Sequence, residues 1–189
     1  MPAALVSASH VIPVEASAAF RMGVVADTHS EPHPRALDLL REQGVSCIVH
    51  AGDIGALRVL DDLARVAPVY AVRGNIDEHA PGLPDVLKLD LDTGADRPLT
   101  VSVLHIGVAG PKLRKDAALL ARKHGASLVV CGHSHVPFIG RDKGLAVFNP
   151  GSIGPRRFTL PIVFGVLEIE GGVCRMYHVS CETGARWTP

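Results

Sequence analysis

The sequence predicts an α/β protein in which two sheets pack face to face and helices cover their outer sides. Three observations favour this class. Short apolar runs alternate with helical patterns up to about residue 75, and most of the remaining chain is typical of paired antiparallel strands. In addition, 47% of the 189 residues are hydrophobic and only 20% are charged, which is enough to bury one sizeable core.

The first part of the chain is typical of a β-α-β-α-β unit. Pro34 suits the first position of a helix and Gly44 ends its pattern, while a second helix shows leucines at helical spacing. Such a unit implies parallel strands joined by right-handed crossovers. Strands are predicted at residues 20–27, 46–53 and 68–75, and helices at residues 34–43 and 56–66.

The second part is predicted to be mainly antiparallel. Polar or glycine-containing turns at residues 92–98, 142–144 and 171–172 each separate two apolar runs, as in a hairpin. One further helix is predicted at residues 112–124, closed by Gly125, and the strand SLVVCG follows it. The two parts together therefore predict parallel strands early in the chain and antiparallel strands late.

The first 19 residues are interpreted as a loose N-terminal tail, and residues 20–189 as a single domain. No Lys or Arg precedes Arg21, and Pro13 and Glu15 interrupt the apolar stretch that an export signal would need. No apolar run approaches the roughly 20 residues of a membrane span. We therefore expect a soluble, cytoplasmic protein whose cysteines are buried free thiols, since no C-x-x-C pair occurs among Cys47, Cys131, Cys174 and Cys181.

The charge balance limits the partners that we expect. Lys plus Arg and Asp plus Glu number 19 each, so the chain has no overall basic field for nucleic acid or an anionic membrane. A small molecule that is held locally is the expected partner. A strand near residues 162–180 could lie at a sheet edge and support a homo-oligomer.

Seven side chains that can bind metal ions lie at or just beyond the ends of predicted strands. In open α/β sheets the loops that leave this end converge on one crevice. Oxygen and nitrogen ligands without thiolates suit manganese and similar divalent ions. The seven candidates are Asp27, His29, Asp53, Asn75, His105, His133 and His135.

Two ions need a carboxylate that bridges them, and Asp53 is the natural bridge. One ion is expected to take Asp27, His29, Asp53 and His135, and the other Asp53, Asn75, His105 and His133. Each piece alone also has an ordinary structural interpretation. Asp53 could cap a helix, Asn75 could occupy a turn, and an H-x-H at a strand end occurs by chance. Their conjunction favours the metal centre.

The order D-x-H, G-D, G-N, H, G-H-x-H and N-P-G-S resembles the calcineurin-like metallophosphoesterase superfamily over residues 20–180. The short chain and Asn149-Pro150-Gly151-Ser152 look most like its small bacterial and archaeal phosphodiesterases. The resemblance implies a four-layer α-β-β-α sandwich of two mixed sheets. It also implies two divalent ions, with manganese expected first and nickel, iron, zinc or magnesium as alternatives.

Two departures from the family pattern concern the substrate. Many members carry a histidine directly after G-N, where this chain has Ile76, and the small enzymes usually read H-G-H where this chain has His105-Ile106-Gly107. Loss of a general acid typically costs 10² to 10⁴-fold in rate. We therefore expect diesters with good leaving groups to react better than alkyl monoesters.

The expected reaction is in-line attack of a metal-bridging hydroxide on a phosphodiester, with Asp53, Asn75 and His105 as catalytic residues. Two alternatives remain open. One is a non-catalytic scaffold of the retromer-subunit type, and the other is a nucleotide or dinucleoside polyphosphate hydrolase that uses the same site.

Several neighbouring residues are expected to have supporting roles. His50 is expected to buttress the Asp53 loop, and Asp77 to pair with an arginine. Ser134 is expected only to space the two histidines that flank it. One of the arginines Arg73, Arg156 and Arg157 could hold a phosphate oxygen.

Overall fold

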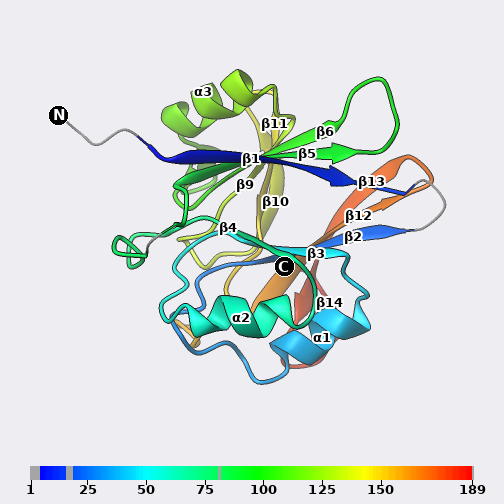
Figure 1. The fold of residues 1–189 in the computed structure, drawn as a ribbon. Helices are drawn as coiled ribbons and strands as arrows, with labels where there is room; N and C mark the ends of the chain where they lie inside the picture. The colour runs from blue at the N-terminus through cyan, green and yellow to red at the C-terminus, as the bar shows by residue number, and fades with distance from the viewer. Residues whose placement is uncertain (1–4, 16–18, 81, 189) are drawn as a thin grey trace.

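In the computed structural model, which describes residues 5–15, 19–80 and 82–188, the chain forms two six-stranded sheets that pack face to face (Figure 1). The first sheet has the order β1 (Ser7–Pro13), β5 (Val86–Asp92), β6 (Leu99–Leu104), β9 (Leu128–Val130), β11 (Leu145–Asn149) and β10 (Phe138–Asp142). The second has the order β14 (Arg186–Trp187), β13 (Val173–Ser180), β12 (Val163–Glu170), β2 (Phe20–Val25), β3 (Cys47–His50) and β4 (Val69–Ala71). Both sheets mix parallel and antiparallel pairs, as predicted.

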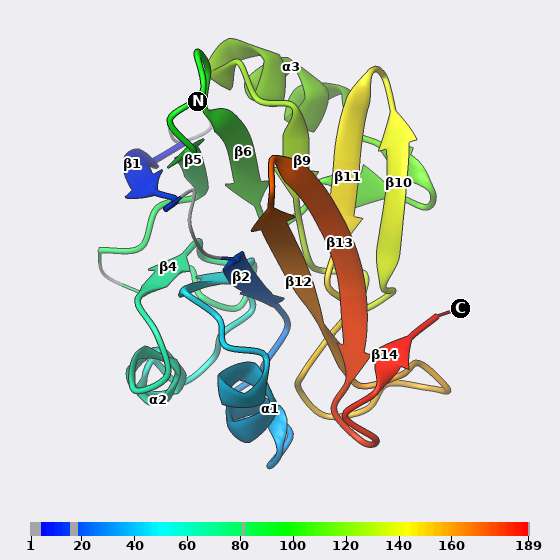
Figure 2. The same ribbon diagram turned by 90° about the vertical axis from the view of Figure 1, so that its right-hand side faces the viewer.

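Helices cover the outer face of each sheet, so the predicted four-layer sandwich is confirmed (Figures 1 and 2). Helix α3 (Lys115–His124) lies on the first sheet, and α1 (Ala36–Glu42) and α2 (Arg58–Ala64) lie on the second. Three apolar layers hold the sandwich together. The layer between the sheets includes Met22, Leu89 and Phe148, and one further layer joins each sheet to the helices on its outer face.

The predicted strand pairings are largely confirmed. Strands β2, β3 and β4 are parallel neighbours, and the hairpins β5–β6, β10–β11 and β12–β13 are antiparallel. The helix predicted to begin at residue 112 begins at Lys115 instead. Residues Lys112–Leu113 form the short strand β8, which pairs with β7 (Val108–Ala109), and Arg114 stays extended with ψ of 150°.

The N-terminal segment differs from its prediction. Ser7–Pro13 is strand β1, which pairs in parallel with β5 from Ser7–Val86 to Pro13–Asp92, so the interpretation as a loose tail is wrong for these residues. The strand satisfies backbone groups of β5 and buries Ile12 between the sheets, and both effects stabilise the pairing. Residues 1–4 and 16–18 of the predicted tail lie outside the described residues. That residues 20–189 form a single domain stays a prediction.

The four cysteines are free, as predicted, and three are buried while Cys174 is exposed. Exposure of Cys174 corrects the expectation that every thiol is buried. None of the helices among the described residues has the length and apolar character that crossing a membrane requires.

Candidate metal centre

The structure brings all seven predicted ligand residues to one edge of the sandwich. Asp27 and His29 follow β2, Asp53 follows β3, Asn75 follows β4, and the three remaining histidines follow β6 and β9. These strands come from both sheets, so the site lies where the two sheets meet. The convergence that the positions at strand ends predict is therefore present in the structure.

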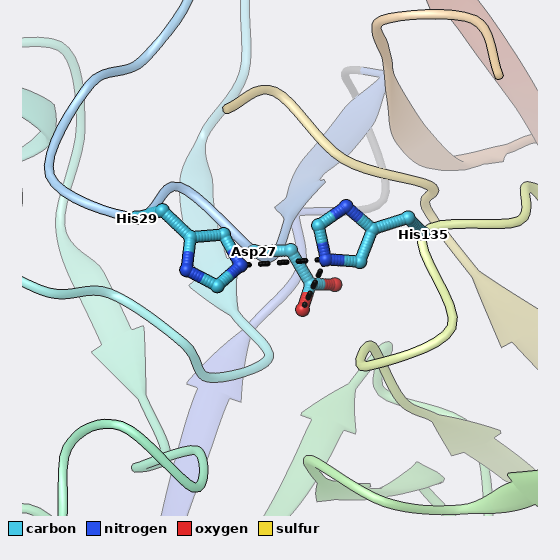
Figure 3. A group of neighbouring side chains, drawn as sticks. All are labelled: Asp27, His29 and His135. Atoms are coloured by element: carbon cyan, nitrogen blue, oxygen red, sulfur yellow. Dashed lines mark hydrogen bonds and ion pairs between the residues drawn. The ribbon is translucent and has the colours of Figure 1, made fainter. Parts of the chain in front are cut away.

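The first group of side chains contains Asp27, His29 and His135 (Figure 3). One ligand atom of each lies within 4.8 Å of the others. The Nε2 atoms of His29 and His135 are 3.3 Å apart, and His135 Nε2 is 3.4 Å from Asp27 Oδ1. Two nitrogens and one carboxylate oxygen thus face a common point.

The second group contains Asp53, His105 and His133, again with ligand atoms within 4.8 Å of one another. Asn75 completes it, because its Oδ1 is 3.1 Å from His105 Nε2 and 3.1 Å from His133 Nδ1. The four residues are those that the sequence assigned to the second ion.

Asp53 lies between the two groups. Its Oδ1 is 3.2 Å from His105 Nε2, and its Oδ2 is 3.8 Å from His29 Nε2, so each carboxylate oxygen faces a different group. Burial acts to raise the pKa of Asp53, but the hydrogen bond and charge of His105, the hydrogen bond from the Ile76 nitrogen and the charge of His29 together outweigh burial and hold the pKa at about 2. The carboxylate is therefore ionised at neutral pH and oriented as a bridge requires.

Unusual backbone geometry is concentrated at these positions. Of the eight non-glycine residues with positive φ among the described residues, five are candidate ligands: Asp27, His29, Asp53, His133 and His135. Glycine allows the close approach of the loops, since a Cβ on Gly74 would lie 2.2 Å from the Asp53 nitrogen. Strained backbone of this kind gathers at functional sites.

The residues present fit divalent cations on three counts. Asp27 is fully buried, and burial raises its pKa to about 7 against the opposing charges of His105 and Arg157, so the ionised carboxylate is short of compensating positive charge. His135 directs Nε2 towards His29 and Asp27, at 3.3 and 3.4 Å, so the nitrogen that faces the group can accept a cation. His105 donates its Nδ1 hydrogen to the Ala51 carbonyl at 2.8 Å, which directs Nε2 towards Asp53 and Asn75.

Protonation of the histidines supports the same conclusion. Burial lowers the pKa of His29, and it lowers the pKa of His135 to about 4, so both rings are neutral and have one nitrogen lone pair at neutral pH. Burial also acts to lower the pKa of His105, but the hydrogen bonds with Asp53 and the Ala51 carbonyl and the negative charges of Asp27 and Asp53 together outweigh burial and raise that pKa. His105 Nε2 thus marks a position where the site requires positive charge.

Buried polar side chains support the loops that carry the candidate ligands. His50 accepts a hydrogen bond from the Gly52 nitrogen and bonds to Thr28 Oγ1, in agreement with its expected buttressing role. Asp77 accepts from the nitrogens of Ile54, Gly55 and Gly74 at 2.8 to 3.0 Å. The expected pairing of Asp77 with an arginine is therefore wrong.

The N-P-G-S segment supports the loops of the candidate ligands through hydrogen bonds that no sequence pattern predicts. Ser152 donates to the Asp27 carbonyl at 2.9 Å, and the Asn149 amide donates to the Gly132 carbonyl at 2.9 Å. Asn149 also donates to Ser134 Oγ at 3.1 Å, so Ser134 does more than space its neighbours.

Only one of the three arginines contacts a candidate ligand in the described residues. Arg157 donates to His29 Nε2 at 3.2 Å, whereas Arg73 forms a bidentate pair with Asp85 at 2.5 and 2.9 Å. Arg156 is paired with Glu182. Arg157 is thus placed to hold an anion beside the first group.

Comparison with known proteins agrees with this geometry. Residues 20–172 match the calcineurin-like phosphoesterase superfamily domain, and the chain belongs to this superfamily. A probable metallophosphoesterase of Methanothermobacter thermautotrophicus is 31% identical over 160 residues, which cover 79% of this chain and 86% of the relative.

Solved structures with the same fold include proteins of different kinds. Vacuolar Protein Sorting 29 from Cryptosporidium parvum matches with a TM-score of 0.72 at 16% identity, covering 89% of this chain and 94% of that one. An archaeal phosphodiesterase matches with a TM-score of 0.63 at 20% identity, covering 85% of this chain and 100% of that one. At these identities the matches establish the fold alone.

Proposed function

We propose that the protein is a dinuclear metal-dependent phosphodiesterase. The observation that carries the proposal is the position of Asp53, whose two carboxylate oxygens face two separate groups of ligand side chains. Asp27, His29, Asp53 and His135 would hold one ion, and Asp53, Asn75, His105 and His133 the other. Manganese is the expected metal because the donor set mixes oxygen and nitrogen and lacks thiolates.

When bound, such ions lower the pKa of a coordinated water and offset the charge of a phosphoryl group. The chain itself fixes the positions of the groups around them. Asn75 and His105 are placed together, with Asn75 Oδ1 3.1 Å from His105 Nε2, so both would hold the second ion, and the Asn75 amide nitrogen could also donate to an oxygen of the substrate. Arg157 supplies a guanidinium beside His29 that can donate to a non-bridging phosphate oxygen.

Ile76 supports the preference for diesters. Its backbone nitrogen donates to Asp53 Oδ1 at 3.2 Å, and its exposed aliphatic side chain has no proton to give. A poor alkoxide leaving group therefore receives no help from this position, whereas an aryl ester needs none. The expected order of rates is aryl diester above alkyl monoester.

The proposal is tested by metal analysis and turnover of the same preparation. The wild-type protein should contain two divalent ions per chain and hydrolyse an aryl diester faster than an alkyl monoester, with manganese compared against nickel, iron, zinc and magnesium. Asp53→Asn should lose at least one ion and all activity. The surface variant Asp62→Asn should retain the two ions and the activity of wild type. Manganese-dependent turnover by Asp53→Asn would contradict the assignment of the bridge.

The fold shared with Vacuolar Protein Sorting 29 keeps the scaffold alternative in the test. A scaffold needs no turnover, so a protein that binds ions yet hydrolyses none of these esters would favour it. Nucleotide and dinucleoside polyphosphate substrates belong in the same panel, because they would use the same site. Cytoplasmic location and self-association stay predictions.

A further inference from the structure

A pocket of about 500 Å³ adjoins the second group of candidate ligands. Asn75 and His105 are among its lining residues, so a substrate whose phosphate lies at the candidate metal centre would extend one of its ester groups into this space. The pocket also includes apolar walls and several charged side chains. The apolar walls are Leu5, Val86, Leu104 and Ile106.

The N-terminal segment forms part of this pocket. The backbone N–H of Val6 donates to Asp85 Oδ2 at 2.7 Å, and the backbone N–H of Asp85 donates to the Val6 carbonyl at 2.7 Å. These bonds hold Leu5 at the pocket, although residues before 20 lie outside the match to the superfamily domain. The wall that Leu5 provides is thus an addition to the matched domain.

The charges of the side chains that line the pocket disfavour a second anionic group on the substrate. Arg73 is neutralised by its bidentate pair with Asp85, and Asp116 is paired with Arg114. Glu78 has no ion-pair partner among the residues that the structure describes and leaves the lining with surplus negative charge. A carboxylate or second phosphate in the pocket would face this charge without a cation to pair with.

We propose that this pocket is a specificity subsite that accepts an uncharged, apolar ester group of the substrate and rejects an anionic one. The proposal rests on the phosphodiesterase function above and narrows it. It favours simple diesters with aryl or alkyl groups over polyphosphate substrates, whose ester group carries further negative charge.

Binding can be measured without turnover. Diphenylphosphinate resembles an aryl diester but has no ester bond to hydrolyse, and zinc-loaded protein is diamagnetic. In methyl-labelled protein, ring currents of the bound phenyl group should shift the methyl resonances of Leu5 and Ile106. The methyl groups of Leu119, which is 66% exposed on α3, should not shift. Shifts confined to residues outside the pocket would overturn the proposal whether or not the protein is a phosphodiesterase.

Kinetics test the charge preference. Two symmetric substrates, bis(4-nitrophenyl) phosphate and its ring-carboxylated analogue, are compared so that either ester group can occupy the pocket. Wild type should prefer the uncarboxylated diester by about tenfold or more in kcat/KM, and Glu78→Lys should narrow that ratio by roughly threefold to tenfold. Glu170→Lys makes the same charge change on an exposed side chain at the end of β12, outside the pocket lining, and should leave the ratio of the two kcat/KM values unchanged.

Leu5→Ala tests the N-terminal wall. It should raise KM for the uncharged diester about threefold to fivefold because apolar contact is lost. Val11→Ala is the matched control, since Val11 is equally exposed on β1 but does not line the pocket. An unchanged substrate ratio in Glu78→Lys, or an unchanged KM in Leu5→Ala, would overturn the subsite, whereas absence of all hydrolysis by wild type would overturn the proposed function instead.

Discussion

Replacement of Asp77 by Asn should destabilise the protein strongly, although Asp77 is not a candidate ligand. Asp77 is 4% exposed, and its Oδ2 accepts from the nitrogens of Ile54 and Gly74 while its Oδ1 accepts from Gly55. An asparagine keeps one acceptor oxygen and turns its amide hydrogens towards the remaining N–H group. Loss of one hydrogen bond to a charged group costs about 1.5 to 3 kcal/mol, and the two retained bonds lose the charge of their acceptor. We expect a total loss of about 2 to 4 kcal/mol.

Urea unfolding followed by circular dichroism measures this loss. With a slope of about 2 kcal/mol per molar urea, the midpoint should fall by about 1 to 2 M. Asp62→Asn is the control, because Asp62 makes only a surface pair with Arg65 and should change the midpoint by less than about 0.3 M. An Asp77→Asn midpoint as close to wild type as that of the control would refute the claim that this carboxylate holds the two loops together.

Three further predictions concern single positions. Gly74→Ala should prevent metal binding, measured as the metal content of the purified protein, because its Cβ would meet the Asp53 nitrogen at 2.2 Å. Gly94→Ala is the control and should leave the metal content unchanged, because no atom lies within 4 Å of the added Cβ. Burial lowers the pKa of His50 to about 3, so below about pH 6.5 the unfolded state binds a proton that the folded state does not. Unfolding experiments should show wild type losing about 2 kcal/mol more stability than His50→Gln between pH 6.5 and pH 5, and equal losses would contradict this. In native protein a thiol reagent should titrate Cys174 rapidly, with the others reacting only on unfolding, since burial raises the pKa of Cys47, Cys131 and Cys181 to about 12; rapid reaction of more than one thiol would count against it.

The parts of the fold that sequence patterns predict are those fixed by local rules. Apolar runs of strand length and their glycine-containing turns predict the hairpins β5–β6, β10–β11 and β12–β13. Strand β1 is different, because its partner β5 lies about eighty residues away and supplies the unpaired edge that orders it. Nothing within Ser7–Pro13 itself distinguishes it from a tail, since Ile12 is its only fully apolar residue that becomes buried.

The candidate site also has features that sequence patterns predict and features that they do not. The convergence of candidate ligands such as Asp53 and Asn75 could be predicted, because strand ends of an α/β sheet converge on one edge whatever the intervening loops do. The supporting bonds could not be predicted. Asp77 contacts backbone nitrogens in two loops, and a carboxylate that accepts from backbone has no characteristic neighbour in the sequence. Only the three-dimensional arrangement distinguishes it from an aspartate that pairs with arginine.

The strained backbone of the site predicts that the supporting residues matter more for stability than the candidate ligands do. Left-handed φ at five candidate ligands costs on the order of 1 kcal/mol for each residue. The total of about 5 kcal/mol is comparable with the net stability of a typical domain. Backbone bonds between neighbouring loops hold this geometry, among them Asp27 N to Gly52 O at 2.9 Å and His29 N to Asp53 O at 3.0 Å. These bonds use no ligand side chain. We therefore expect replacement of a candidate ligand to remove the proposed activity and leave this network of backbone bonds intact, whereas replacement of Asp77 removes hydrogen bonds that hold the loops.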